Sequence, residues 1–295
     1  MKRFKGSLFL LITAVIWGTA FVAQSVAMDS LGPFTFNALR MFLGGCALLP
    51  VLLIIRRRSP EGFGDKKELL RGGVLCGAVL TFASATQNYA FVFPDVTVGK
   101  AGFITTLYVV LVPLIAFVFL RRKLRPVIIP CIILAVAGLY LLCMTGKINF
   151  SRGELVLLLC ALLFSLHILT ADHFSPRVNG VALSCIQFFS ASVISAVCAL
   201  LFERSSFSLS VIGDAWFSIV YAGVISCGVG YTLQIVGQRY VEPSVASLLM
   251  SLESVFAVIS GWIILQVTLS LRELIGCILM FAAVVLSELP EKKKA

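Results

Sequence analysis

The feature that most limits the fold is a series of long apolar runs along the whole chain. Each run has enough residues for a helix that crosses the roughly 30 Å hydrocarbon core of a bilayer. Helices are the natural spanning element because lipid offers no partner for a backbone N–H group. Only 13% of the residues are charged, about half the share in a soluble domain. The sequence therefore predicts an all-α polytopic membrane protein.

The apolar runs divide into ten expected transmembrane helices. Breaks in hydropathy, together with charged and Pro or Gly residues, separate one run from the next. The expected spans are residues 7–27, 34–55, 71–93, 97–120, 126–145, 153–171, 180–202, 213–236, 243–265 and 270–288. The first run follows a basic start and imitates a signal peptide. Its length and the spans that follow at once favour a first transmembrane helix that is not cleaved.

The basic residues predict the orientation of these spans. If the N-terminus is inside, 18 of the 24 Lys and Arg residues fall in the inside segments and 5 in the outside loops. Cytoplasmic loops carry such an excess, so we expect both termini in the cytoplasm. The net charge of +10 is thereby explained as topology, and no nucleic-acid partner is expected. All nine Cys lie inside apolar runs, which indicates small buried side chains, with no disulfide, metal site or other cofactor.

The two halves of the chain have the same layout. Residues 1–146 and 147–295 each hold five expected helices in the same order of long and short connections. A shift of 147 lays Gln87 on Gln234, and a shift of 145 lays Tyr108 on Glu253. Since five is odd, the second half would enter the membrane inverted. Inverted repeats are typical of secondary transporters, which bind their substrate at the repeat interface near the midplane.

Four segments resemble a known family. AVIWGTAFVAQ (14–24), LGPFTFNALRMFLGG (31–45), GKAGFITTLYVVLVPL (99–114) and SVASLLMSLESVFAVISGW (244–262) are similar to the EamA-type ten-helix permeases of the drug/metabolite transporter superfamily. In the last segment, relatives commonly carry A-x-L-L-x-x-E-P-V. Here Ser254 stands in place of the Pro, so the residue that would break the helix is absent.

The resemblance implies the function and the location. It implies a multi-pass protein of the plasma (inner) membrane, bacterial in type, that transports a small amino-acid-like or drug-like metabolite. We expect an exporter that works by alternating access across a cavity between the repeats. Protons or a counter-substrate are possible coupling partners, and facilitated diffusion remains open. There is no GxxxxGK[ST] loop for ATP.

Three ionisable residues within the spans are the first candidates for the site. Such groups are costly at the membrane centre, so they tend to face a cavity or a partner. Glu253 is about ten residues from either end of its span and could bind an amine, carry a proton or pair structurally. Arg40 could bind an anion, pair with a carboxylate such as Glu253, or reach the outer surface. His167 could relay protons or hold one interhelical hydrogen bond.

Uncharged residues complete the candidate set. Gln87 and Gln234, the repeat-related pair, and Asn88 could donate to a substrate or join helices by hydrogen bonds. Trp17 and Tyr108 could line a cavity and stack on an aromatic or cationic substrate, or simply pack.

Three other functions are alternatives to a metabolite exporter. A nucleotide-sugar or phosphorylated-metabolite antiporter of the same superfamily would need more basic residues in the cavity than Arg40. A structural or sensory membrane protein is a second alternative, which transport of any solute into proteoliposomes would separate from a transporter. An intramembrane enzyme has no constellation to support it, because Ser165 and His167 are two residues apart on one helix and point in different directions.

Overall fold

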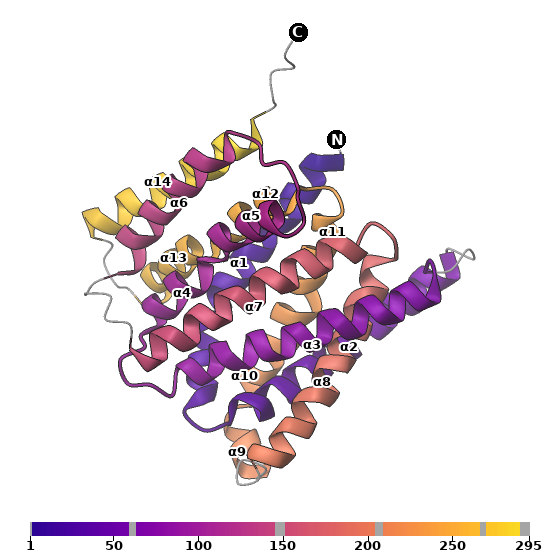
Figure 1. Ribbon diagram of the computed structural model, residues 1–295. Helices are drawn as coiled ribbons and strands as arrows, with labels where there is room; N and C mark the ends of the chain where they lie inside the picture. Colours follow the sequence, from indigo (N-terminus) through magenta and orange to yellow (C-terminus); the bar gives the residue numbers. More distant parts are fainter. Residues whose placement is uncertain (1, 59–62, 145–150, 204–208, 266–269, 290–295) are drawn as a thin grey trace.

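The computed structural model describes residues 2–58, 63–144, 151–203, 209–265 and 270–289 (Figure 1). Within these ranges the chain is helical, with no strand. The first half holds α1 (Lys2–Met28), α2 (Pro33–Arg58), α3 (Lys66–Ala90), α4 (Val98–Thr106), α5 (Tyr108–Val118) and α6 (Ile128–Cys143). The second half holds α7 (Arg152–Phe174), α8 (Gly180–Phe202), α9 (Leu209–Asp214), α10 (Trp216–Val220), the π-helix η2 (Tyr221–Tyr231), α11 (Thr232–Gln238), α12 (Pro243–Ser251), α13 (Glu253–Leu265) and α14 (Leu271–Glu288).

Eight helical segments among the described residues are long and apolar enough to cross a membrane. Two of the ten expected spans fall short of that standard. The apolar helix α6 has 16 residues, about 24 Å in length. Helix α14 has 18 residues but carries Arg272, Glu273 and Glu288. The polytopic membrane protein is therefore established, whereas the count of ten spans stays a prediction.

The first and last described helices meet at their outer ends. Arg3 Nε lies 3.5 Å from the Glu288 carboxylate, and the Ser7 hydroxyl donates to the same carboxylate at 2.9 Å. The start of α1 therefore lies beside the end of α14 (Figure 1). The start of the first helix and the end of the last one on the same side agree with the expected topology, and which side faces the cytoplasm stays a prediction. The basic tail, Lys292 to Lys294, lies outside the described residues.

Several helices begin at the polar residues that the sequence places before each apolar run. The side chains of Asp65, Thr97 and Ser151 accept from the backbone N–H three residues on, and Asn179 accepts from Val181 and Ala182. Ser270 forms a full capping box with Glu273. Each cap satisfies N–H groups that a helix start leaves free, which fixes where the span enters the structure.

The two halves pack through matching contacts. Helix α2 lies against α8, its counterpart in the other half, and α6 lies against its counterpart α14. Helix α3 packs on α7, and the corresponding contact joins α1 to η2 and α11. Helix α7 touches α4 and α5, while α1 touches α12 and α13. Every major contact therefore has a partner in which the roles of the halves are exchanged.

The fourth helix of each half is broken at the same position. Helix α4 ends at Thr106 and α5 starts at Tyr108; α12 ends at Ser251 and α13 starts at Glu253. The linking residues, Leu107 and Leu252, have nearly identical backbones (φ −59°, ψ −6° and φ −61°, ψ −9°). Each donates its N–H to the residue three before it, as in a tight helical turn. The break at Leu252 thus forms without the Pro of the family pattern.

A close glycine contact lies near each end of the molecule. A Cβ at Gly153, at the start of α7, would lie 2.4 Å from Val96 Cγ2. A Cβ at Gly6, near the start of α1, would lie 2.9 Å from Val241 Cγ2. The starts of α1 and α7 lie at opposite ends of the molecule (Figure 1). Gly allows these backbones to approach each other closely.

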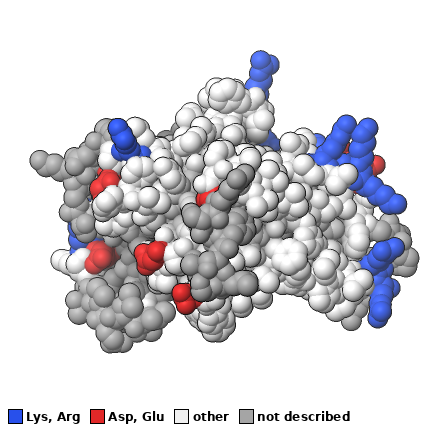
Figure 2. All heavy atoms as spheres, turned by 90° about the horizontal axis from the view of Figure 1, so that it is seen from below, with Lys and Arg blue, Asp and Glu red and all other residues white. Residues whose placement is uncertain are grey.

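The polarity of the surface suits a bilayer. Large apolar side chains such as Phe119, Phe202 and Leu271 are about three-quarters exposed, whereas many polar side chains are fully buried. Figure 2 shows Lys and Arg gathered most densely at one side, with a broad uncharged surface beside them. Exposed basic residues at the end of α2 and the start of α3 include Arg56, Arg57, Lys66 and Lys67. Lipid can cover the apolar surface, and the buried polar groups point to an interior site.

Candidate functional site

A buried cavity lies between the two halves, and we call it the central cavity. It is lined from both halves by Trp17, Phe21, Gln24, Arg40, Gln87, Thr105, Tyr108, Phe164, Ser226, Tyr231 and Glu253. Its volume is about 30 Å³, room for about two water molecules. Because this volume is too small for a solute, side chains must move to admit one, and we call this arrangement the closed state.

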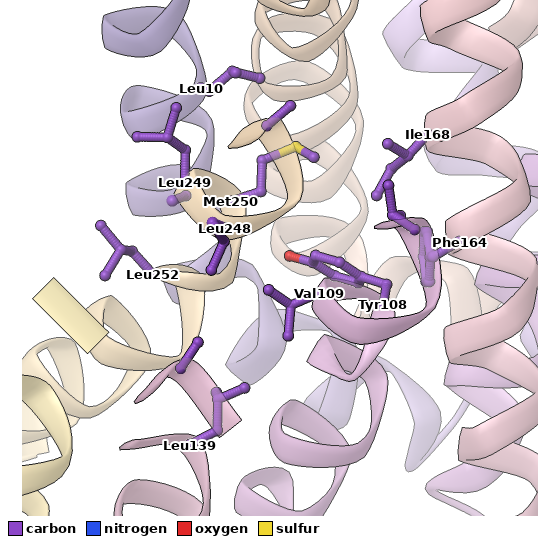
Figure 3. Close-up of a cluster of buried hydrophobic side chains, with 14 of the residues drawn as sticks. Leu10, Tyr108, Val109, Leu139, Phe164, Ile168, Leu248, Leu249, Met250 and Leu252 are labelled. Carbon is purple, nitrogen blue, oxygen red and sulfur yellow. The ribbon is translucent and has the colours of Figure 1, made fainter. Parts of the chain in front are cut away.

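Glu253 is held in this cavity by residues of the other half. The Tyr108 hydroxyl donates to Glu253 Oε1 at 3.0 Å, and the Thr106 hydroxyl can donate to the same oxygen at 3.2 Å. Tyr108 reaches from α5 toward the segment that carries Leu248 and Leu252 (Figure 3). Glu253 is only 4% exposed, and no cation lies within 4 Å among the described side chains. Two neutral donors therefore orient this carboxylate and leave its charge uncompensated.

Arg40 lies in the same cavity on α2. It is 2% exposed, so it does not reach the outer surface as one expectation held. Its Nε donates to Asn37 Oδ1 at 2.9 Å, and its guanidinium lies 5.1 Å from the Phe36 ring centroid. Within the described part of the chain no carboxylate lies within 4 Å of it, so the expected direct pairing with Glu253 is absent. A buried Arg without an acidic partner is available to an anionic group.

Aromatic rings form part of the cavity wall, and further rings pack behind them. Tyr231 lies at the centre of the group: its ring centroid is 4.5 Å from that of Trp17, 5.8 Å from His167 and 6.2 Å from Phe188. Tyr231 ends the π-helix η2. Such i→i+5 segments are rare and often occur at functional sites. Gly230 lets η2 approach α1 closely, since a Cβ there would lie 2.8 Å from Trp17 Nε1.

Two cavity residues carry polar atoms without a partner among the described residues. These buried atoms are Trp17 Nε1 and Gln24 Oε1. Leaving such atoms unpaired in the interior is costly. A donor and an acceptor at the cavity wall are consistent with a site that water or a polar solute completes.

The structure brings five of the eight predicted site residues to the central cavity: Trp17, Arg40, Gln87, Tyr108 and Glu253. The other three lie elsewhere. His167 Nε2 is 2.8 Å from Gln187 Oε1, the interhelical bond given as its alternative role. Asn88 Nδ2 donates to Asn37 Oδ1 at 3.3 Å. Gln234 is fully buried, and its amide atoms have no partner among the described residues.

Sequence reasoning missed the cavity residues Phe21, Gln24, Thr105, Phe164 and Ser226. Phe and Thr in an apolar helix carry no polarity signal that distinguishes a cavity face from a packed face. Phe164 had one usable signal, because the shift of 147 lays it on Trp17. The repeat relation could therefore have found this one cavity residue, which polarity did not mark.

Two segments of the chain, residues 4–144 and 151–289, match the EamA-like transporter family. The chain belongs to this family. It is a membrane transporter of the drug/metabolite transporter superfamily, as the sequence resemblance predicted. The matched segments follow the two halves described above and exclude only short stretches at the ends and the middle.

Relatives agree with this assignment. An uncharacterized transporter of Archaeoglobus fulgidus is 29% identical over 289 residues, covering 98% of this chain and 87% of the relative. The uncharacterized transporter YoaV of Bacillus subtilis is 21% identical over 281 residues, covering 94% of each. A solved crystal structure has a TM-score of 0.77, with 19% identity and 96% of both chains covered. The last comparison shows a shared fold.

Proposed function

We propose that this chain is a secondary transporter that exports a small zwitterionic, amino-acid-like solute. The observation that carries the proposal is the presence of Glu253 and Arg40 in one buried cavity without an ion pair between them. A solute with an ammonium and a carboxylate would compensate both charges at once. The aromatic wall of Trp17 and Tyr231 would contact an apolar side chain of the solute.

The same two charges argue against other solutes. A cationic drug would be attracted by Glu253 but would meet Arg40 in a cavity that excludes water. A phosphorylated metabolite would be attracted by Arg40 but repelled by Glu253. In the desolvated interior both mismatches cost more than they would in water. A zwitterion avoids both.

Alternating access is the mechanism that we propose. The matching contacts of the two halves, the matching breaks at Leu107 and Leu252 and the glycine contacts at both ends support it. The two halves, 1–146 and 147–295, would act as inverted repeats. Opening the Gly6–Val241 contact would expose the cavity at one end, and opening the Gly153–Val96 contact would expose it at the other.

Transport of labelled L-phenylalanine into proteoliposomes tests the proposal. We expect uptake by wild type and strong loss in Arg40→Gln and Glu253→Gln. The controls Arg56→Gln and Glu68→Gln remove charges of the same sign from the surface and should leave uptake unchanged. Ligand-induced thermal stabilisation separates the roles, because it can be measured in variants that no longer transport. Phenethylamine, which lacks the carboxylate, should stabilise Arg40→Gln more than wild type, whereas N-acetyl-phenylalanine, which lacks the ammonium, should stabilise Glu253→Gln more than wild type. Equal uptake by all four variants would contradict the proposal.

A further inference from the structure

Glu253 belongs to a chain of hydroxyl groups that leads away from the central cavity. The Thr106 Oγ1 atom lies 3.2 Å from Glu253 Oε1 and 3.2 Å from Ser254 Oγ. Ser254 is 2% exposed and Thr106 is fully buried. Oxygens of Glu253, Thr106 and Ser254 thus lie in a row at hydrogen-bonding distance, with Thr106 in the middle.

The far end of the row opens into a second cavity, which we call the side cavity. Its lining includes Thr97, Gly102, Cys143, Ser254 and Glu273. Its volume is about 330 Å³, several times that of the central cavity. Gly102 leaves space next to the serine, since Ser254 Oγ, at 3.9 Å, is the nearest described atom to a Cβ there. Water can therefore reach Ser254.

The side cavity lies toward one end of the molecule. Thr97 caps the start of α4, and Glu273 lies in the first turn of α14. These starts lie at the same end as the Gly153–Val96 contact, the end expected to face outside. Thr106 and Ser254 lie between this cavity and Glu253, which lines only the central cavity.

We propose that Ser254 and Thr106 conduct protons between the side cavity and Glu253 while the central cavity is closed. The proposal deepens the transport function above, because it names the route by which the carboxylate of that site gains and loses a proton. An uncompensated carboxylate is costly at membrane depth. A proton delivered by this route would neutralise Glu253 whenever no solute ammonium is present.

The transfer is balanced at each atom. A hydrated proton in the side cavity gives its proton to Ser254 Oγ, and the Ser254 proton passes to Thr106 Oγ1. The Thr106 proton passes in turn to Glu253 Oε1, which becomes a carboxylic acid. Each hydroxyl gives one proton and takes one, so both end unchanged after they rotate back. The reverse sequence removes the proton.

Other ionisable groups face Glu253 from the helices around it. They are Tyr108 on α5, Tyr231 on η2, Cys143 on α6, Cys160 on α7 and, across the central cavity, Arg40 on α2. Only Thr106 connects the carboxylate to the wider cavity through a further hydroxyl among the described contacts. The Pro of the family pattern at position 254 has no hydroxyl, so the route depends on the serine of this chain.

Hydrogen–deuterium exchange at the Glu253 carboxyl group tests the route directly. The protein is placed in lipid nanodiscs, and the carboxyl C=O band is followed by infrared spectroscopy after a change to heavy water, over a range of pH. Comparison with Glu253→Gln assigns the band. We expect Ser254→Ala and Thr106→Val to slow the exchange by roughly 100-fold. Ser254→Thr keeps the hydroxyl and should restore the wild-type rate.

Ser165→Ala is the matched control, because Ser165 is a buried helical serine whose hydroxyl, among the described residues, bonds only to Ala161 O of its own helix. It should exchange at the wild-type rate. Wild-type exchange in Ser254→Ala would overturn the proposal, and so would the absence of any Glu253 carboxyl band across the pH range. The measurement needs no solute. If phenylalanine is not transported but Ser254→Ala slows the exchange, the proposed function is rejected and the relay is kept. If phenylalanine is transported but Ser254→Ala exchanges at the wild-type rate, the relay is rejected and the proposed function is kept.

Discussion

Tyr108 and Glu253, which occupy the same position in the two halves of the chain, bond to each other in the wall of the central cavity. The hydroxyl of Tyr108 donates to Glu253 Oε1 at 3.0 Å. Each residue starts the helix that follows a break, after Leu107 in one half and Leu252 in the other. The contact therefore joins the two halves at the point where both helices are interrupted.

Replacing Tyr108 with Phe removes this bond and leaves the ring. We expect a loss of stability of about 1 kcal/mol, because Thr106 remains as a donor to Glu253. Thermal unfolding in nanodiscs measures the loss. Tyr89→Phe is the control, since Tyr89 is about half exposed. Equal stability of both variants would show that the bond contributes nothing to the joining of the halves.

Much of this site could be predicted from the sequence, and the residues that could not were missed for physical reasons. Glu253 and Arg40 could be predicted because charge at membrane depth demands an interior position. His167, Asn88 and Gln234 could not be separated from cavity residues, since an uncharged polar group is satisfied equally by a helix neighbour and by a solute. Which way each side chain faces depends on how the helices are rotated, and nearly uniform apolar runs do not encode that rotation strongly.

The helix breaks and the π-helix show a second limit. Nothing at Leu252 marks a break, because the Pro of the family pattern is Ser254 here. Instead, the break matches that at Leu107 in the other half. The sequence YAGVISCGVGY forms a π-helix, although its pattern reads as an ordinary span. Close packing against α1 and α2 accompanies that geometry, since Gly223 and Gly230 lie tightly against Arg40 and Trp17.

The glycine contact at the start of α7 predicts a specific rescue. Gly153→Ala would place a methyl group 2.4 Å from Val96 Cγ2, so we expect destabilisation by about 1–3 kcal/mol. Val96→Ala removes the clashing atom, and the double variant should recover part of the loss. A double-mutant cycle of unfolding free energies measures the coupling. Strict additivity of the two changes would mean that the contact does not form.

The contact at the start of α1 should respond differently. A Cβ at Gly6 would lie 2.9 Å from Val241 Cγ2 but also 2.9 Å from the Gly237 carbonyl oxygen. Because Val241→Ala cannot remove the backbone atom, we expect little recovery of stability in the Gly6→Ala, Val241→Ala double variant. Full recovery in the same unfolding assay would argue against the close backbone approach.

An ion pair reinforces the end that holds Gly153. Lys100 Nζ lies 2.9 Å from Glu154 Oε1, with Lys100 18% and Glu154 2% exposed at the side chain. Lys100→Glu should destabilise the protein by about 1–3 kcal/mol, less than for a fully buried pair. The exchanged pair, Lys100→Glu with Glu154→Lys, should recover much of the lost stability. A double variant no more stable than Lys100→Glu in thermal unfolding would exclude the pair as a stabilising contact.

The connection between α3 and α4 should respond to acid. A hydrogen bond from Ser151 lowers the pKa of the Asp95 carboxyl below its ordinary value. The stabilisation is therefore complete above the ordinary pKa of Asp and is lost as the pH falls through the lowered value in the folded protein. Limited proteolysis of the connection across that pH range measures this loss of stabilisation. Asp95→Asn should abolish the dependence and Asp29→Asn should keep it; the same profile in both would refute the assignment.

The central claim is that one solute bridges Arg40 and Glu253, and a structure determined with L-phenylalanine bound tests it most directly. The account predicts density in the central cavity, with the solute carboxylate at the Arg40 guanidinium, its ammonium at the Glu253 carboxylate and its ring against Trp17 and Tyr231. Phenylalanine bound with its two charged groups away from these residues, or only in the side cavity, would contradict the account.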